Sequence, residues 1–208
     1  KCDLAGSQGP FLGSWQVNEG GGGATGKFTL WEGGHREVGV AYWPGMIQPR
    51  VSNALVSSLD VFPTLLSLAG VPLPTDRDFD GIDLTDVLLH GSEQGHETLF
   101  HPDGAGQLHA YRYGELKFHN VTYSAETCGK KGGKTITHDP PLVFNLTADP
   151  AESTPITPPD DVMQKAIAAS IAKMASINNG FRSHVNYSSS NSVGPCCNSA
   201  HDNCRCTQ

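Results

Sequence analysis

The sequence predicts an α/β protein whose second half holds a small antiparallel sheet with a packed helix. In the first half, a strand-like apolar run over residues 38–43 is followed by a helix-like stretch over residues 60–69. After residue 96, four short β-rich segments separated by turns precede one amphipathic stretch. We therefore expect two domains, residues 1–95 and residues 96–208.

The expected elements of the first domain follow from apolar runs and turn residues. Residues 28–31 are predicted to be extended, and residues 38–43 to form a buried strand that ends at the turn Pro44-Gly45. The helix over about 60–69 begins at Asp60 as its cap, has Pro63 in its first turn and stops at Gly70. One or two helical turns are expected over 84–89, ending at Gly91. The side chains expected to face inward from the helix are Leu65, Leu66, Leu68 and Ala69.

The second domain is predicted from alternation and helical spacing. Strands are expected over 98–101, 108–113, 115–121 and 142–146, with a tight hairpin turn at Tyr113-Gly114-Glu115. A helix is expected over 160–177, begun by Asp160 or Asp161. The apolar side chains that repeat at helical spacing along it are Val162, Ala166, Ile167, Ile171, Met174 and Ile177.

Composition excludes several classes of protein. The formal net charge is −7, whereas a nucleic-acid-binding domain needs a basic surface. Gly and Pro together number 38 of 208 residues, too few for a low-complexity chain. The twenty mostly apolar residues 54–73 contain Asp60, Pro63 and Pro72, so a membrane span is not expected there.

Three glycosylation sequons and six cysteines indicate the secretory pathway. The sequons are Asn120-Val-Thr, Asn145-Leu-Thr and Asn186-Tyr-Ser. The cysteines favour disulfides over a zinc site, with their pairing left open, because oxidised thiols are typical of secreted proteins. The candidates are Cys2, Cys128, Cys196, Cys197, Cys204 and Cys206. Because the chain opens at Lys1 without a signal region, we expect it to be part of a longer lysosomal or secreted glycoprotein.

The Gly-rich segment before Lys27 has a partial likeness to a phosphate-binding loop. Gly21, Gly26 and Lys27 have its spacing, but Phe28 stands where a Mg²⁺-binding Ser or Thr is required, and no helix is expected to follow. A nucleotide site is therefore not expected. Lys27 could still present its ammonium to another anion or remain a solvated surface lysine, and composition alone favours the second.

Four ordered motifs carry a resemblance to a known family. They are Lys27-Phe-Thr-Leu-Trp-Glu-Gly-Gly-His-Arg36, Ala41-Tyr-Trp-Pro-Gly45, Ser58-Leu-Asp-Val-Phe-Pro-Thr-Leu-Leu66 and Phe79-Asp-Gly-Ile-Asp83. In this order they resemble the type I sulfatases, most closely the arylsulfatase A and G group. The segment Leu99-Phe-His-Pro102 and the Cys-rich tail are similar to the G branch of that group. The sequence departs from the family at Val38, where Pro is common.

The resemblance implies an alkaline-phosphatase-like α/β fold, of which this chain is the C-terminal part of the main domain plus the small C-terminal domain. It also implies hydrolysis of sulfate esters by a formylglycine, made from Cys in a C-x-P-S-R or C-x-A-x-R motif, with a Ca²⁺ ion. None of the six cysteines begins such a motif, and the Asp-Asn metal pair would fall before Lys1. The nucleophile and metal ligands are therefore expected outside this chain.

The resemblance also implies roles for individual residues. Lys27 matches the lysine that contacts the substrate sulfate, and His119 falls where lysosomal members carry a histidine near the pocket. Glu32 and Arg36 are expected to form an ion pair that supports the turn at Gly33 and Gly34, where glycine permits close backbone approach.

Two functions from different classes follow. In the first, the chain is part of an arylsulfatase acting on a sulfated small molecule or glycan, and these 208 residues alone are inactive. In the second, the chain is a truncated, non-catalytic secretory glycoprotein that binds sulfated glycans weakly. The net acidic charge disfavours the second, because only Lys130, Lys131 and Lys134 approach a basic cluster.

Overall fold

The computed structural model describes residues 6–103, 106–126 and 131–180, the last four without their side chains. The chain divides into two compact units, Lys1–Met174 and Ala175–Gln208, and the described residues lie almost entirely in the first. The predicted domain boundary near residue 95 stays a prediction. No helix in the described ranges is both long and apolar enough to cross a membrane.

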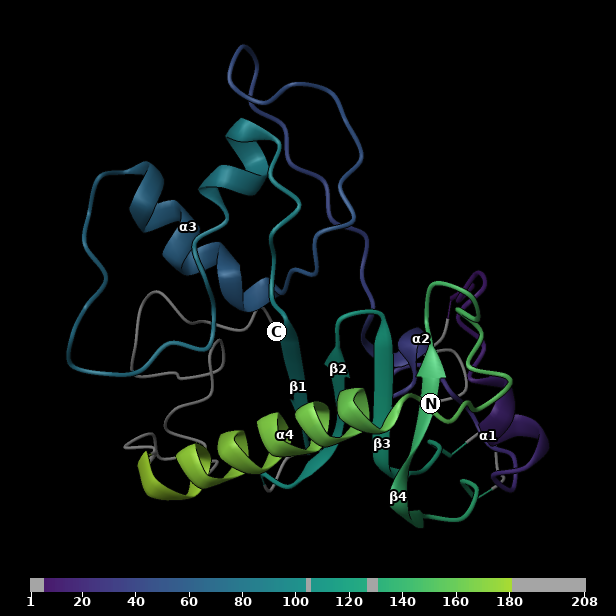
Figure 1. Ribbon diagram of the computed structural model, residues 1–208. Helices are drawn as coiled ribbons and strands as arrows, with labels where there is room; N and C mark the ends of the chain where they lie inside the picture. The colour runs from purple at the N-terminus through teal and green to yellow at the C-terminus, as the bar shows by residue number, and fades with distance from the viewer. Residues whose placement is uncertain (1–5, 104–105, 127–130, 181–208) are drawn as a thin grey trace, which may run out of the picture. The chain divides into compact units, whose positions relative to one another are not determined.

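A four-stranded antiparallel sheet forms the centre of the first unit (Figure 1). Its strands are β1 (Thr98–Pro102), β2 (Leu108–Tyr113), β3 (Leu116–Thr122) and β4 (Ile136–Asn145), and they pair in chain order. Gly114 has φ of 56° in the β2–β3 turn, a conformation that glycine adopts without a steric cost. The predicted strands and hairpin are confirmed, and β4 begins six residues earlier than the sequence indicated.

One face of the sheet packs against helix α4 (Asp160–Gly180), which crosses the strands in Figure 1. Tyr111 and Phe118 stack with ring centroids 4.9 Å apart, and the buried Ala166 of the helix joins their cluster. The predicted helix is confirmed, although Ile171, one of the apolar residues that repeat along it, is 64% exposed. The neighbouring Ser170 is buried instead.

The opposite face of the sheet is covered by the N-terminal segment. This segment contains the short helices α1 (Ser14–Asn18) and α2 (Glu32–His35). Trp15 and Trp31 from it form a second buried cluster with Phe144 and Leu146. The Trp31 indole also donates a hydrogen bond to the carbonyl of Tyr123 at 3.0 Å. Because both faces of the sheet are covered, charged side chains on one of these faces can be buried.

The predicted helix near residue 60 is present with a different inward face. It comprises the 3₁₀ turn η1 (Ser58–Asp60) and α3 (Val61–Leu68), and Gly70 with φ of 67° follows its end as expected. Asp60 is buried and accepts hydrogen bonds from the backbone N–H groups of Ser57 and Ile82. Pro63 and Thr64 are the buried positions, so the expectation that Leu65 and Ala69 face inward was wrong. The later turn η2 (Asp86–His90) stops at Gly91 as predicted.

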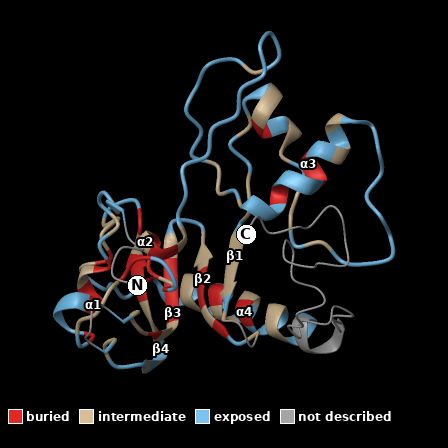
Figure 2. Cartoon of the chain, turned by 180° about the vertical axis from the view of Figure 1, so that it is seen from behind, coloured by how far each residue is buried: buried red, intermediate tan, exposed pale blue. Residues whose placement is uncertain are grey.

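Two predicted extended segments were wrong. Residues 28–31 form a turn in which Phe28 has φ of 73°, because the Thr29 hydroxyl hydrogen-bonds to preceding backbone carbonyls. Residues 38–43 pair with none of the described strands, and Val38 is 91% exposed. A strand needs a neighbour for its N–H and C=O groups, and an apolar run alone does not supply one. Figure 2 shows this exposure along the loops that precede α3.

Candidate functional site

The loop that carries Lys27 is held by backbone hydrogen bonds rather than by a strand. The Thr29 N–H donates to the carbonyl of Gly26 at 3.2 Å, and the Thr29 hydroxyl lies 2.9 Å from the Thr25 carbonyl and 2.8 Å from the Gly26 carbonyl. Thr25 and Thr29 are both buried. The two residues thus fix the backbone on either side of Lys27 while its side chain stays 57% exposed.

Gly33 and Gly34 let α2 pack directly on neighbouring backbone. A Cβ atom on Gly34 would lie 2.3 Å from the Thr29 carbonyl oxygen, and one on Gly33 would lie 2.4 Å from the Phe11 carbonyl oxygen. Both distances are far below van der Waals contact. Close backbone approach at these two glycines therefore joins α2 to the Lys27 loop and to the segment before α1.

Replacing Gly34 by Ala tests this packing. Because the added methyl group meets backbone that cannot rotate away, we expect the free energy of unfolding to fall by about 1–3 kcal/mol. Gly39→Ala is the matched control, since nothing lies within 4 Å of a Cβ there. Denaturant unfolding of both variants checks the prediction, and equal stability of the two would contradict it.

Lys27 lines an open surface cavity of about 670 Å³. Gly33, Gly34 and Arg36 line the same cavity. The Lys27 ammonium lies 3.3 Å from the carboxylate of Glu37, which is 76% exposed. An exposed pair of this kind contributes roughly 0–1 kcal/mol. An incoming anion can therefore displace Glu37 from Lys27 at small energetic cost.

Behind this cavity lies a buried ion cluster, formed by Glu32, Lys117, His119 and Glu152. The Lys117 ammonium lies 2.9 Å from Glu32 Oε1 and 3.3 Å from Glu152 Oε1, and its side chain is fully buried. His119 Nε2 lies 2.9 Å from Glu152 Oε1. Glu152 Oε2 accepts a hydrogen bond from the backbone N–H of Glu32 at 2.7 Å. The cluster joins strand β3, the start of α2 and the segment that follows β4.

The acidic members of the cluster stay ionised. Burial would raise the pKa of Glu32, but the hydrogen bond with His35 and the charge of Lys117 together lower it far below its usual range. Burial opposes ionisation of Glu152 as well, yet Lys117 and His119 lower its pKa. Burial lowers the pKa of His119 and therefore favours its neutral form.

The structure places the remaining predicted site residues around this cluster. Arg36 Nε donates to Glu32 Oε2 at 2.5 Å, and its guanidinium lies 4.7 Å from the centre of the Phe11 ring. His119 is 1% exposed and lies against Trp31, with ring centroids 4.5 Å apart. A substrate contact by His119 stays a prediction. Asn186 and the six cysteines lie outside the described residues.

Sequence reasoning missed Lys117 and Glu152. The signal for Lys117 was its place between Leu116 and Phe118 within a predicted strand, on the face that also carries His119. No local signal identified Glu152, which has φ of 50° and lies in a turn after β4. Glu32 and Lys117 are 85 residues apart in the sequence.

Partly buried histidines make the stability of this unit pH-dependent. Burial lowers the pKa of His101 to about 2, and its ring lies 4.2 Å from that of His35, whose pKa burial also lowers. A histidine whose pKa is lower in the folded state binds more protons when unfolded. Its contribution to stability is therefore complete above pH 6.5 and declines as the pH falls toward the folded pKa.

We expect the free energy of unfolding to fall between pH 7 and pH 5, by at most about 1.4 kcal/mol per pH unit for each such histidine. The lowered carboxylate pKa values add a further loss only below about pH 4.3. His101→Gln should reduce the slope between pH 7 and 5. Denaturant unfolding at pH 7 and at pH 5 measures the free energy of unfolding, and equal values for the wild type at the two pH values would refute the prediction.

Comparison with known proteins identifies the family. Residues 94–206 match the family described as the C-terminal region of aryl-sulfatase, and residues 9–71 match the sulfatase family. The chain belongs to the sulfatases. The predicted family and fold class are confirmed, since the small antiparallel sheet with its packed helix is the C-terminal sulfatase region.

The arylsulfatase G relatives match nearly the whole chain. Arylsulfatase G of Canis lupus familiaris is 44% identical over 216 residues, which cover 99% of this chain and 40% of the relative. Arylsulfatase G of Homo sapiens is 42% identical over 99% of this chain, and 41% of the relative is covered. Human arylsulfatase A is 39% identical over 62% of this chain, and 27% of the relative is covered. The chain thus spans about 40% of the length of the arylsulfatase G relatives.

A solved structure shares the fold. Its title concerns the metabolism of multiple glycosaminoglycans by Bacteroides thetaiotaomicron. The structure superposes on this chain with a TM-score of 0.52 at 24% sequence identity. The superposition covers 64% of this chain and 28% of that one.

Proposed function

We propose that this chain is part of a sulfuric ester hydrolase and that Lys27 binds the sulfate group of its substrate. The observation that carries the proposal is the exposed Lys27 ammonium at the cavity, on a loop fixed by buried Thr25 and Thr29. A preorganised cation placed on a sulfate oxygen stabilises the charge that develops as the ester bond breaks. The arylsulfatase relatives support the reaction class.

The reaction also needs a formylglycine and a Ca²⁺ ion, as family membership implies. The described residues do not fit a calcium site, because no group of three His, Cys, Asp or Glu side chains among them could hold a metal ion. The six cysteines lack the C-x-P-S-R context for a formylglycine. We therefore assign this chain the binding of the substrate and the support of that site, rather than the sulfate transfer itself.

The substrate is proposed to be a sulfated small molecule or glycan, and the location to be the lysosome or the extracellular space. Three sequons support passage through the secretory pathway. Nucleic acid is not proposed as a partner, because the net charge is −7.

Release of sulfate from a chromogenic aryl sulfate tests the proposal. We expect the 208 residues alone to release none, and a longer protein that joins them to a C-x-P-S-R motif and an Asp-Asn pair to release sulfate. The matched control is the same longer protein with the Cys of that motif replaced by Ala. Absence of turnover in a folded longer protein with formylglycine present would overturn the proposal and favour a non-catalytic glycoprotein.

A further inference from the structure

The two described sequons differ sharply in what the folded chain does with their side chains. Asn120 lies within β3, in the middle of the sheet, whereas Asn145 is the last residue of the edge strand β4. From this difference we propose that Asn145 carries an N-linked glycan and that Asn120 does not.

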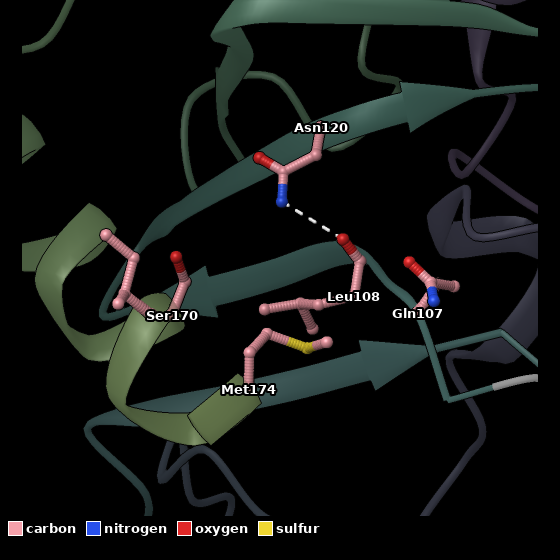
Figure 3. A pocket seen from close by; sticks show the side chains of 6 residues that line it. Gln107, Leu108, Asn120, Ser170 and Met174 are labelled. Atoms are coloured by element: carbon pink, nitrogen blue, oxygen red, sulfur yellow. Dashed lines mark hydrogen bonds between the residues drawn. The ribbon is translucent and has the colours of Figure 1, made fainter. Parts of the chain in front are cut away.

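Asn120 uses the atom that a glycan would need. Its Nδ2 donates to the carbonyl of Leu108 at 3.0 Å, at the place where the β2–β3 pairing ends at Ala110 and His119 (Figure 3). The side chain lines a small cavity of about 290 Å³, together with Ser170 and Met174 of α4. A preassembled oligosaccharide is far larger than this space. Attachment at Asn120 would therefore disturb the Nδ2 bond to Leu108 and crowd the side chains of α4 that line the cavity.

The hydroxyl residue of the first sequon is also inaccessible. Thr122 is 1% exposed, and its Oγ1 lies 2.9 Å from His138 Nε2. A transferase that reads the sequon must reach this hydroxyl together with the asparagine. In the folded sheet the Thr122 hydroxyl is buried, and the Asn120 amide nitrogen is already bonded to the Leu108 carbonyl.

Asn145 presents the opposite arrangement. Its Oδ1 accepts hydrogen bonds from the backbone N–H groups of Thr147 and Ala148, each at 3.0 Å and at an exposed position. Both bonds involve Oδ1, and Nδ2 takes part in neither of them. Thr147 is exposed, and the intervening Leu146 is buried and anchors the segment to the sheet. The sequon is thus held in place with Thr147 at the surface and with Nδ2 of Asn145 not used in these two bonds.

The chemistry requires a polyprenyl-pyrophosphate-linked oligosaccharide and its transferase. The Nδ2 of Asn145 bonds to C1 of the first sugar, the bond from C1 to the pyrophosphate oxygen breaks, and the lipid pyrophosphate leaves with that electron pair. One Nδ2 proton passes to a base of the transferase. The product amide keeps its other N–H, so the Oδ1 hydrogen bonds to Thr147 and Ala148 persist.

The test is site occupancy in the full chain directed into the secretory pathway of a eukaryotic cell, with Asn186→Gln as the background. An amidase that removes N-glycans converts a modified Asn to Asp, which peptide mass spectrometry locates. We expect Asp at 145 and unchanged Asn at 120 in the folded, secreted protein. Modified Asn120 or unmodified Asn145 in that protein would overturn the proposal.

Matched variants keep the result independent of folding. Thr147→Ala removes the sequon while it leaves Asn145 in place, and should abolish the mass shift; Thr147→Ser restores the sequon and the shift. Asn120→Gln should leave the shift unchanged. If the mass shift survives Thr147→Ala but disappears with Asn120→Gln, the glycan is on Asn120 and the inference is refuted.

Discussion

Replacing Lys27 by Ala should lower kcat/KM for an aryl sulfate by about a hundredfold in the active sulfatase that contains this chain. Removal of one preorganised charge contact typically costs about 2.7–4 kcal/mol of transition-state stabilisation. Lys27 is an exposed cation at the cavity beside Gly33 and Gly34, and its pairing with Glu37 is weak enough to be displaced. Steady-state kinetics at saturating Ca²⁺ measure the effect.

Lys165→Ala provides the matched control for this experiment. Lys165 also pairs with an exposed carboxylate, that of Asp161 at 3.4 Å, and it lies on the surface of α4 away from the cavity. We expect its kinetics to equal those of the wild type. Unchanged turnover of a correctly folded Lys27→Ala variant would show that Lys27 is a solvated surface residue.

Replacing Lys117 by Met should lower the free energy of unfolding by about 3–5 kcal/mol. The substitution leaves the carboxylates of Glu32 and Glu152 buried without their shared cation. Removing one partner of a buried ion pair costs this much, because the remaining charge has lost both water and its partner. Denaturant unfolding at pH 7 measures the loss, and the exposed Lys165→Met should change stability by less than about 0.5 kcal/mol.

A second substitution separates charge from packing in the cluster. Adding Glu152→Gln to Lys117→Met removes one of the two carboxylates that have lost Lys117, so the double variant should be more stable than the sum of the single variants predicts. Strict additivity would mean that the cost comes from the lost packing of Lys117 rather than from its charge.

The sheet could be predicted because its signals are local. Alternation and turn residues placed the hairpin at Gly114 and the strands around it, and the helix that begins at Asp160 followed from its apolar spacing. The turn at Phe28 was not predictable from these patterns, because it depends on the bonds of the Thr29 hydroxyl. Residues 38–43 have a strand-like sequence, but a strand forms only where a neighbour pairs with it.

Only part of the candidate site could be predicted from the sequence. Lys27, Glu32 and Arg36 lie in one motif, so the resemblance to sulfatases could identify them together. Lys117 and Glu152 are brought to Glu32 only by the folded sheet and the turn after β4. Because a buried lysine and a surface lysine look alike in a sequence, the partners of Lys117 became evident from the packing alone.

Competitive inhibition by inorganic sulfate tests most directly whether Lys27 holds the sulfate group. The inhibition constant of the active sulfatase containing this chain would be compared with that of its Lys27→Ala variant at one pH and ionic strength. A charge-assisted hydrogen bond contributes about 1.5–3 kcal/mol, so we predict inhibition weaker by roughly ten- to a hundredfold in the variant. An inhibition constant unchanged by Lys27→Ala would contradict the account.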